Sequence, residues 1–417
     1  MRGSKNNEFI LGLKPLIGAM IGAGCGLSSI SFYTHGAFVV SIANNTGWSR
    51  GDVQLGVSIM ILMAIVTAPT VGFLVDRFGA RRVALISIPL YGLSMSSFYF
   101  ISTSLTAYYL VWAFMAVIGA GTLPVTWTRV VNGWFDRHRG IALGITLAGT
   151  GFAATLAPTY VTWLIADYGW QSAYLILACT ITLVSLPGVY FLFFEADKYN
   201  PNKAKKKQTN ETIEQQAHSF KRAVKGYHFW AIGIALILAA AAISGLITNS
   251  VPMLTDQGKT LQQAAKYAGL IGLSVISGRL VVGFLVDYFW APLVAALFLS
   301  APIFSIYILS TTEPNAIMVS TAMIIIGLAA GAELDLLAFL VSRYFGLHDY
   351  GKIYGALYIF FSIGAGLAPA LFGMAFDHFG SYSLALKTVA IMSLISGVLM
   401  LSLGRYPDLE SKGHRQP

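Results

Sequence analysis

Five side chains that can carry a charge lie inside long apolar runs of the sequence: His35, Arg129, Arg279, Glu333 and Asp335. If those runs cross a membrane, each charge costs about 2.5–3.5 kcal/mol at the bilayer centre even on lenient scales. Such groups are expected only where they do chemical work. An arginine fork binds a carboxylate through two parallel hydrogen bonds, whereas carboxylates and imidazole can exchange protons. The set therefore predicts anion binding coupled to proton movement.

Arg279 is the first candidate for an anion ligand. It precedes Asp287, which ends its apolar run, by eight residues, or about 12 Å of helix, so it lies near mid-bilayer. Glu333 and Asp335 are two residues apart, so on a helix they point about 200° apart and cannot share one cavity. Glu333 lies deeper and is favoured as the proton-coupling group. A structural ion pair between Arg279 and one carboxylate is the alternative, and an anion displacing that carboxylate would reconcile the two.

The remaining candidates have weaker support. His35 suits proton or substrate work, although a neutral, hydrogen-bonded histidine is the alternative. Arg129 either lines the inner half of a cavity or extends to the membrane interface. Several polar and aromatic side chains are candidate cavity residues, each with simple packing as the alternative: Tyr33, Trp127, Asn249, Tyr358 and Ser362.

Composition indicates which elements must hold these residues. Of 417 residues, 56% are hydrophobic and 11% are charged, against about 25% charged in an ordinary soluble domain. This excludes a soluble enzyme, a disordered chain and a disulfide scaffold. Cys25 and Cys179 both lie in apolar stretches and are interpreted as core residues. No phosphate-binding loop, metal-ligand cluster or nucleophilic triad is recognisable, so we expect neither an enzyme nor a cofactor.

A spanning helix needs about 20 mostly apolar residues, and the sequence predicts twelve of them. They cover residues 15–41, 53–75, 82–103, 106–131, 140–166, 172–194, 228–253, 264–287, 289–310, 314–342, 351–376 and 383–404. The first is too long for a signal peptide, and such runs exclude an alternating β-barrel.

Lysine and arginine predict the orientation, because cytoplasmic loops are rich in both. Most basic residues fall on the side of the two termini, including the run Lys205–Lys207, and four fall on the other side: Arg50, Lys259, Lys266 and Lys387. Both termini are therefore predicted to be cytoplasmic. The net charge of +9 needs no nucleic acid to explain it. We expect a monomer in a cell membrane, most simply a bacterial inner membrane.

The chain also repeats itself. Gly72-Phe-Leu-Val-Asp76 matches Gly283-Phe-Leu-Val-Asp287, and the same offset of 211 residues (283 − 72) relates Leu156-Ala-Pro158 to Leu367-Ala-Pro369. This predicts two homologous six-helix halves, 1–194 and 228–417, joined by a cytoplasmic linker, 195–227. Repeats of this kind build transporters whose substrate site lies near the midplane between the halves.

The loop Gly72-Phe-Leu-Val-Asp76-Arg77-Phe-Gly79-Ala-Arg81-Arg82 resembles the signature motif of the major facilitator superfamily. The resemblance implies an all-α membrane protein with twelve helices in two pseudo-symmetric six-helix bundles. It also suggests a cytoplasmic gate formed by Asp76, Arg77, Arg81, Arg82 and Asp287, with topology determination by the arginines as the alternative. The second copy lacks the arginines, so any gate is asymmetric.

Three further stretches resemble the monocarboxylate porter and oxalate/formate antiporter-like branch: Gly47-Trp-Ser-Arg-Gly-Asp52, Trp134-Phe-Asp-Arg-His-Arg-Gly140 and Gly278-Arg279. In that branch, an arginine four residues before the helix-8 glycine binds the substrate anion, and Arg279 and Gly283 have this spacing. The resemblance implies transport of a mono- or dicarboxylate by proton symport or anion exchange. Val275 stands where eukaryotic relatives carry an aspartate, so their proton relay does not transfer unchanged.

Two other functions fit the sequence less well. A multidrug/proton antiporter would explain the glycines and proline between Gly149 and Pro158, but Met115 holds roughly the place of the arginine expected in that group. A non-transporting sensor would need a soluble domain, and the longest polar stretch is only about 30 residues.

Overall fold

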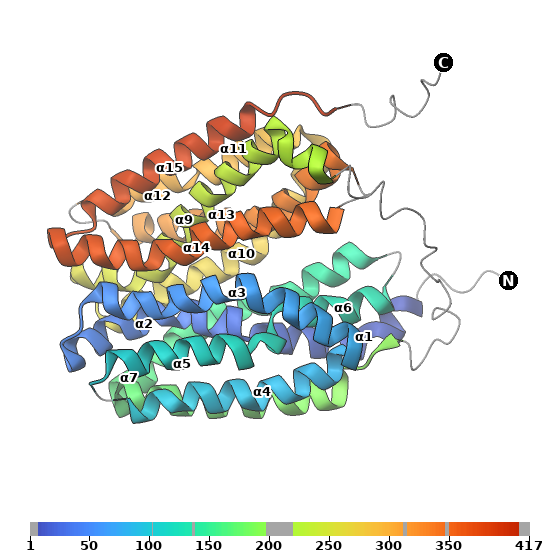
Figure 1. Ribbon diagram of the computed structural model, residues 1–417. Helices are drawn as coiled ribbons and strands as arrows, with labels where there is room; N and C mark the ends of the chain where they lie inside the picture. Colours follow the sequence, from blue (N-terminus) through green and yellow to red (C-terminus); the bar gives the residue numbers. More distant parts are fainter. Residues whose placement is uncertain are drawn as a thin grey trace, which may run out of the picture.

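The computed structural model describes residues 7–101, 103–135, 138–196, 220–311, 315–346 and 350–407, and within these ranges the regular elements are helices without any strand. The all-α class predicted from the sequence is therefore confirmed. The helices run roughly parallel to one long axis and form two bundles, one above the other in Figure 1.

The lower bundle in Figure 1 comes from the first half of the chain. Its helices are α1 (Asn7–Gly24), α2 (Leu27–Thr46), α3 (Arg50–Phe78), α4 (Ala80–Ser96), α5 (Leu105–Ile118), α6 (Pro124–Trp134) and α7 (Arg139–Leu192), with short 3₁₀ turns at Ser97–Phe100 and Ala120–Thr122. The upper bundle comes from the second half. Its helices are α9 (Tyr227–Asp256), α10 (Leu261–Tyr288), α11 (Ala291–Ser300), α12 (Pro302–Leu309), α13 (Ala316–Phe345), α14 (Tyr350–Phe379) and α15 (Ser383–Leu401).

Each predicted span has a helical counterpart. Ten described segments are long and apolar enough to cross a bilayer. One of them contains two passes, because α7 turns at Gly169, whose φ of 78° favours glycine. Gly380, its counterpart in the second half, ends α14 with a φ of 65°. The shorter α5 and α6 follow one another as a further pass.

The first predicted span, 15–41, is a pair of helices that together run from Asn7 to Thr46. They meet at Gly26, which is extended at φ −78° and ψ 168°. The Thr122 hydroxyl accepts a hydrogen bond from the Leu27 backbone N–H at 2.9 Å. That donor would otherwise be unsatisfied at the start of α2.

Repeat-related helices also begin in the same way. Ser49 caps α3 and Thr260 caps α10, because each side chain accepts a hydrogen bond from the backbone N–H three residues on. In turn, the side chains of Asp52 and Gln263 accept a hydrogen bond from the backbone N–H of the cap residue. These are reciprocal capping boxes. They fix where α3 and α10 start, and so the height at which their side chains reach the space between the halves.

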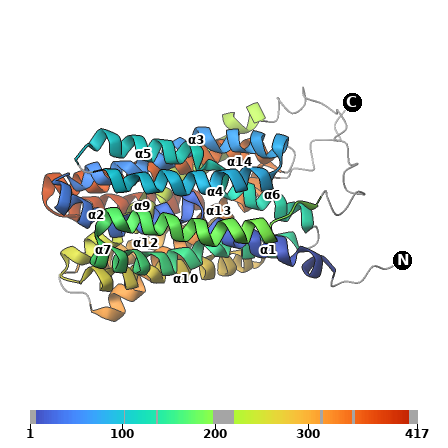
Figure 2. The same cartoon turned by 90° about the horizontal axis from the view of Figure 1, so that it is seen from below.

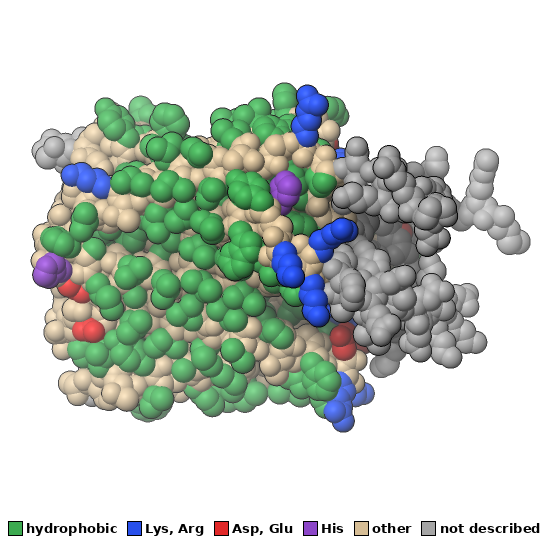
Figure 3. Space-filling view, turned by 45° about the horizontal axis from the view of Figure 1, so that its top comes forward, with side chains coloured by type: hydrophobic (Ala, Val, Ile, Leu, Met, Phe, Trp, Pro, Cys, Tyr) green, Lys and Arg blue, Asp and Glu red, His purple; other side chains and the backbone are tan. Residues whose placement is uncertain are grey.

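The buried apolar residues of the two halves form separate clusters, one drawn from residues 16–193 and two from residues 223–403. The outer surface is apolar over its middle, whereas Lys and Arg gather near the right-hand end in Figure 3. That distribution fits a protein that crosses a bilayer. Most of the predicted linker 195–227 lies outside the described residues.

The described chain begins and ends at the same end of the bundle (Figure 1), which we call the inner end. The opposite end, where α3 starts and α9 and α14 finish, is the outer end. Figure 2 shows the same arrangement of long helices from below.

Candidate functional site

Arg279 lies where α10 and α13 cross closely. The crossing is close because Gly278 and Gly331 face the opposing backbone, and a Cβ at either would collide with Leu328 or with the Val275 carbonyl. Small residues let helices approach in this way. The sequence therefore places the only arginine of α10 directly beside the two carboxylates of α13.

The ion pair made by Arg279 is loose. Its Nη1 lies 3.6 Å from Oδ1 of Asp335, and the two side chains are 16% and 36% exposed. A separation of 3.6 Å is too long for a hydrogen bond. The Arg279 Nε is buried and has no hydrogen-bond partner among the described residues. The planar fork is therefore held in place by charge, while its donors remain available to a ligand.

Glu333 lies near this pair but does not join it. Its side chain is only 5% exposed, and Oε1 has no hydrogen-bond partner in the described part of the chain. Tyr33 of α2, in the other half, lies within electrostatic reach of both Arg279 and Glu333 and packs against the core of the second half. Of the predicted residues, the structure thus brings together Tyr33, Arg279, Glu333 and Asp335. The arginine pairs with Asp335; the sequence left this pairing open between the two carboxylates and favoured Glu333 only for proton coupling.

Two predicted cavity residues pack inside the first half instead. His35 is fully buried, and Trp112 of α5 meets its ring edge-to-face at 5.2 Å between centroids. Trp127 is also fully buried. Its indole N–H donates to the Thr122 carbonyl at 2.9 Å. In this conformation neither is grouped with Arg279.

Asn249 links the two halves. Its side-chain oxygen accepts a hydrogen bond from Gln54 Nε2 at 2.9 Å, and Gln54 also donates to the Thr248 carbonyl at 3.3 Å. Asn249 and Gln54 are completely buried. On α14, Ser362 donates to the Tyr358 carbonyl at 2.9 Å. Tyr358 lies one turn before Ser362 on the same helix.

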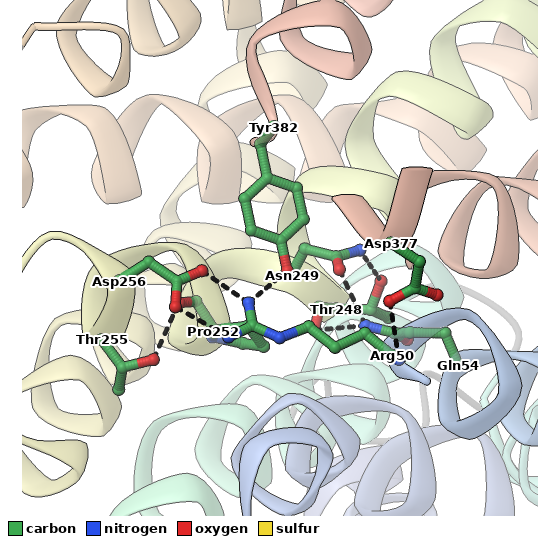
Figure 4. Close-up of polar contacts among 9 residues, drawn as sticks. All are labelled: Arg50, Gln54, Thr248, Asn249, Pro252, Thr255, Asp256, Asp377 and Tyr382. Carbon is green, nitrogen blue, oxygen red and sulfur yellow. Dashed lines mark hydrogen bonds and ion pairs between the residues drawn. The ribbon is translucent and has the colours of Figure 1, made fainter. Parts of the chain in front are cut away.

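At the outer end a polar network that the sequence did not single out joins the halves (Figure 4). Arg50, the first residue of α3, binds the Asp256 carboxylate with both terminal nitrogens, at 2.5 and 2.7 Å. It also donates to the Tyr382 hydroxyl at 3.0 Å and lies 3.9 Å above the Phe376 ring. The only sequence signal was the Gly47–Asp52 motif, in which Arg50 counted merely as a charge on the outer side.

Asp377, at the end of α14, completes this network. Its carboxylate accepts hydrogen bonds from the backbone N–H groups of Arg50, at 2.9 Å, and Gly51, at 2.6 Å. A carboxylate at a helix N-terminus is favoured by the helix dipole and by the unsatisfied N–H groups there. One half of the molecule thus caps a helix of the other. We call Arg50, Asp256, Asp377 and Tyr382 the outer latch.

Within the described part of the chain, no hydrogen bond or ion pair of the predicted gate joins the halves at the inner end. Asp76 pairs with Arg129 of the same half at 3.2 Å, and both side chains are mostly exposed, at 68% and 60%. Arg81 also bonds within its own half, donating to the Tyr190 carbonyl at 2.7 Å. Arg77 lies 5.5 Å from the Phe78 ring, while Arg82 and Asp287 are exposed.

Glycines show how contact between the halves changes along the helices. A Cβ at Gly373 of α14 would collide with Gly51 of α3, and one at Gly272 of α10 would collide with Thr155 of α7. Towards the inner end the same faces carry Gly72 on α3, Gly144 on α7, Gly283 on α10 and Gly355 on α14. A Cβ at any of these four would meet nothing within 4 Å. The halves are therefore packed together at the outer end, and the same helix faces are open at the inner end.

Comparison with known proteins gives a consistent picture. A family model described as Major Facilitator Superfamily matches residues 21–369. Among curated relatives, the "Uncharacterized MFS-type transporter YhjX" of Escherichia coli is 23% identical over 343 residues, covering 80% of this chain and 82% of that protein. "Monocarboxylate transporter 10" of Homo sapiens is 24% identical over 386 residues, covering 89% and 71%.

Solved structures share the fold. The nucleoside transporter NupG superposes with a TM-score of 0.77 at 14% identity, covering 95% of this chain and 100% of that one. The xylose transporter XylE from E. coli, in an inward-open conformation, gives a TM-score of 0.69 at 16% identity, covering 97% and 98%. At such low identity these likenesses show the fold alone.

Proposed function

This chain belongs to the major facilitator superfamily of membrane transporters, and from that premise we propose that it carries a small organic anion, a mono- or dicarboxylate, by alternating access. Arg279 is the residue that binds the carboxylate. Movement is driven by protons or by exchange for a second anion. Relatives named as monocarboxylate transporters support the choice of substrate class.

The state of Arg279 is the observation that carries this proposal. A largely buried guanidinium is costly unless its charge and its N–H groups are satisfied. Here it has one carboxylate at 3.6 Å and a buried Nε without a partner among the described residues. A substrate carboxylate would supply two parallel hydrogen bonds to the fork. Tyr33 of the other half lies within electrostatic reach of Arg279, which supports a binding site between the two halves, where a rocking transporter holds its cargo.

Coupling follows from the neighbouring carboxylates. A substrate that binds Arg279 competes with Asp335, and a carboxylate that loses its counter-charge binds a proton more readily. Asp335 and Glu333 are therefore the proposed proton-coupling groups, with His35 as a third. The same competition permits exchange, because an outgoing anion restores the Arg279–Asp335 pair before another one binds.

The outer latch supports the transport cycle. It seals the outer end in this conformation, while the helix faces at the inner end are open. The opposite state would open the latch and bring the inner faces together, with Asp76, Arg77, Arg81, Arg82 and Asp287 as the proposed inner gate. We place the protein in a bacterial inner membrane as a monomer, with both termini cytoplasmic.

Uptake of labelled carboxylates into proteoliposomes tests the proposal, with an imposed pH gradient or an internal counter-anion. Arg279→Lys keeps the charge but loses the planar fork. We expect it to raise the anion concentration at half-saturation by about tenfold to a hundredfold. The exposed control Arg405→Lys should transport like the wild type. Undiminished anion affinity in Arg279→Lys would refute the assignment of Arg279. Export of a cationic dye without any anion uptake would refute the proposed function as a whole.

A further inference from the structure

A pocket of about 440 Å³ lies in the first half of the molecule, and Arg279 is not among the residues that line it. Its walls are the end of α1, the start of α2 and the two arms of α7, which are the stretches before and after the turn at Gly169. The volume falls within the range of about 300–1,000 Å³ that is typical of small-molecule sites. The transport cycle proposed above gives this pocket no role.

The pocket is preformed, because neighbouring backbones prevent its walls from closing. A Cβ at Gly24 of α1 would collide with the Gly149 carbonyl of α7, and one at Gly149 would collide with the Met20 carbonyl. The two helices are therefore already in backbone contact beside the pocket and cannot approach further. Between the arms of α7, the hydroxyls of Tyr160 and Thr180 form a hydrogen bond of 3.0 Å, which fixes the spacing of the arms at the pocket wall.

The chemistry of the walls excludes a charged occupant. Among the described residues that line the pocket none is charged, and the polar side chains are those of Cys25, Tyr160 and Thr180. The last two hydrogen-bond to each other, and Thr180 also donates to the Ile176 carbonyl at 2.8 Å. A charged ligand would lose its hydration here without gaining a partner. An apolar ligand would gain the dispersion contacts that an unfilled wall forfeits.

The position of the pocket indicates where an apolar occupant comes from. The side chains of Phe152, Leu156 and Val184 line it and are each at least half exposed, so it is continuous with the lipid-facing surface. Cys25 lies about midway along residues 7–46, which places the pocket near the middle of the bilayer, where the surroundings are acyl chains. We propose that this pocket binds one acyl chain of a membrane phospholipid.

The bound chain supports the contact between the two halves from behind. Gly149 and Ala153 of α7 line the pocket. Gly151 and Thr155, each two residues further on and so about 200° around the helix, contact α10. There a Cβ at Gly151 would collide with the Ile276 side chain. The first arm of α7 thus has α10 on one side and the pocket on the other, and the chain packs the side that the protein leaves unfilled.

Photo-crosslinking of the full-length protein tests the site without any variant. The protein is reconstituted with a phosphatidylethanolamine that carries a diazirine near the middle of one acyl chain, irradiated, and mapped by peptide mass spectrometry. Leu110 and Phe114 of α5 are at least as exposed as Phe152 and Val184 but lie outside the pocket. We expect the yield of adducts on Phe152 and Val184 to be about tenfold higher than on the α5 pair. Equal yields on both surfaces would overturn the site.

A pocket-filling substitution and a matched control locate the bound chain. Ala153→Phe fills the pocket, whereas Ala113→Phe adds the same side chain at a half-buried alanine of α5 outside it. We expect Ala153→Phe to lower the yield of adducts on Val184 about tenfold and Ala113→Phe to leave it unchanged. If Ala153→Phe does not fold, the smaller Ala153→Leu should lower the same yield. An unchanged yield in a folded pocket-filling variant would place the chain elsewhere.

The melting temperature in detergent gives a second readout. A bound ligand stabilises the folded state by mass action, so added phospholipid should raise the melting temperature of the wild type and of Ala113→Phe more than that of Ala153→Phe. An equal rise in all three would overturn the proposal. A second copy of the chain in the pocket would instead shield Phe152 and Val184 from lipid and give a dimer in native mass spectrometry. That result would also overturn the acyl-chain site, and it would leave the proposed anion transport untouched.

Discussion

At the scale of single residues, Arg50 and Arg279 differ in how completely their charge and N–H groups are paired. Arg50 has a bidentate carboxylate, a phenol and an aromatic ring within contact distance. Arg279 has one carboxylate at 3.6 Å. Since a buried ion is stabilised only when its donors are used, this contrast supports a structural role for Arg50 and the proposed ligand-binding role for Arg279.

The outer latch allows a prediction at this scale. In a background with Cys25→Ser and Cys179→Ser, Ser58→Cys reports opening of the outer end, because Ser58 is buried and its hydroxyl accepts a hydrogen bond from the Ala370 N–H of the other half. Arg50→Gln leaves Asp256 without its cation, whereas the backbone N–H groups that bind Asp377 remain. We expect labelling by a membrane-impermeant maleimide from the outer side to rise about tenfold or more. Unchanged labelling would show that the latch does not hold the outer end shut.

Tyr382→Phe is the matched control for Arg50→Gln. The phenol contributes one hydrogen bond, about 1 kcal/mol, so we expect labelling to rise by no more than about fivefold.

Burial raises the pKa of Tyr382 from its usual value near 10 to about 12. The closed state thus holds the phenol proton more tightly than the open state does. The stabilisation of the closed state by protonated Tyr382 is therefore lost only as the pH rises from about 10 to about 12. After correction for thiol reactivity, labelling should not change between about pH 6 and about pH 9 on account of Tyr382.

At the scale of helices, repeat-related faces explain how two packed halves can rock. Gly272 and Gly283 lie on one face of α10, about three turns apart. A Cβ at Gly272 would collide with Thr155, whereas one at Gly283 would meet nothing within 4 Å. Gly72, the counterpart of Gly283 in the first half, is open in the same way. The sequence thus has a glycine both at the middle of this face of α10 and towards its inner end, although only Gly272 contacts the other half here.

This arrangement predicts opposite effects for two similar substitutions. Gly283→Val should leave thermal stability near wild type but reduce transport about tenfold or more, because the added side chain obstructs the approach of the inner ends. Gly272→Val overpacks a contact that already exists, which typically costs about 1–3 kcal/mol, so it should lower the melting temperature. Melting temperatures and uptake rates of the two variants check this. Wild-type uptake by Gly283→Val would contradict closure along this face.

At the scale of the whole molecule, the two ends differ in charge and in contact. The inner end has Lys and Arg at its surface, and the outer end has the latch (Figures 3 and 4). The latch is asymmetric between the repeats. Thr260 and Gln263 match Ser49 and Asp52, but Leu261 stands where the first half has Arg50. The repeat thus accounts for the matching starts of α3 and α10. The difference between Arg50 and Leu261 accounts for the presence of the latch arginine in the first half alone.

Orientation in the membrane is a prediction at this scale. Cytoplasmic ends are rich in Lys and Arg, so the inner end should face the cytoplasm. In the same cysteine-free background, Lys387→Cys should react with an impermeant maleimide on intact cells, and Arg405→Cys only after the membrane is made permeable. Both positions are exposed. The reverse labelling pattern would invert the orientation and exchange the two sides of the proposed cycle.

The sequence by itself determined the helical class, the succession of membrane spans and the family. Apolar run length, the repeat and the Gly72–Arg82 motif are local in the chain, and the energetic cost of exposing backbone in lipid leaves few alternatives to a helix. It also singled out Arg279, because a charge in an apolar run is visible without any knowledge of packing. By contrast, helical phase alone separated Glu333 from Asp335 without showing which one faces Arg279.

Only the tertiary structure decided those pairings. Asp335 meets Arg279 because two glycines let α10 and α13 cross closely, and Arg50 meets Asp256 and Asp377 because helices distant in the chain end at the same height. Such contacts depend on how two bundles pack, which no local pattern encodes. The same packing placed His35 and Trp127 in the first half, paired Asp76 with Arg129 of its own half and joined the two halves at the outer end.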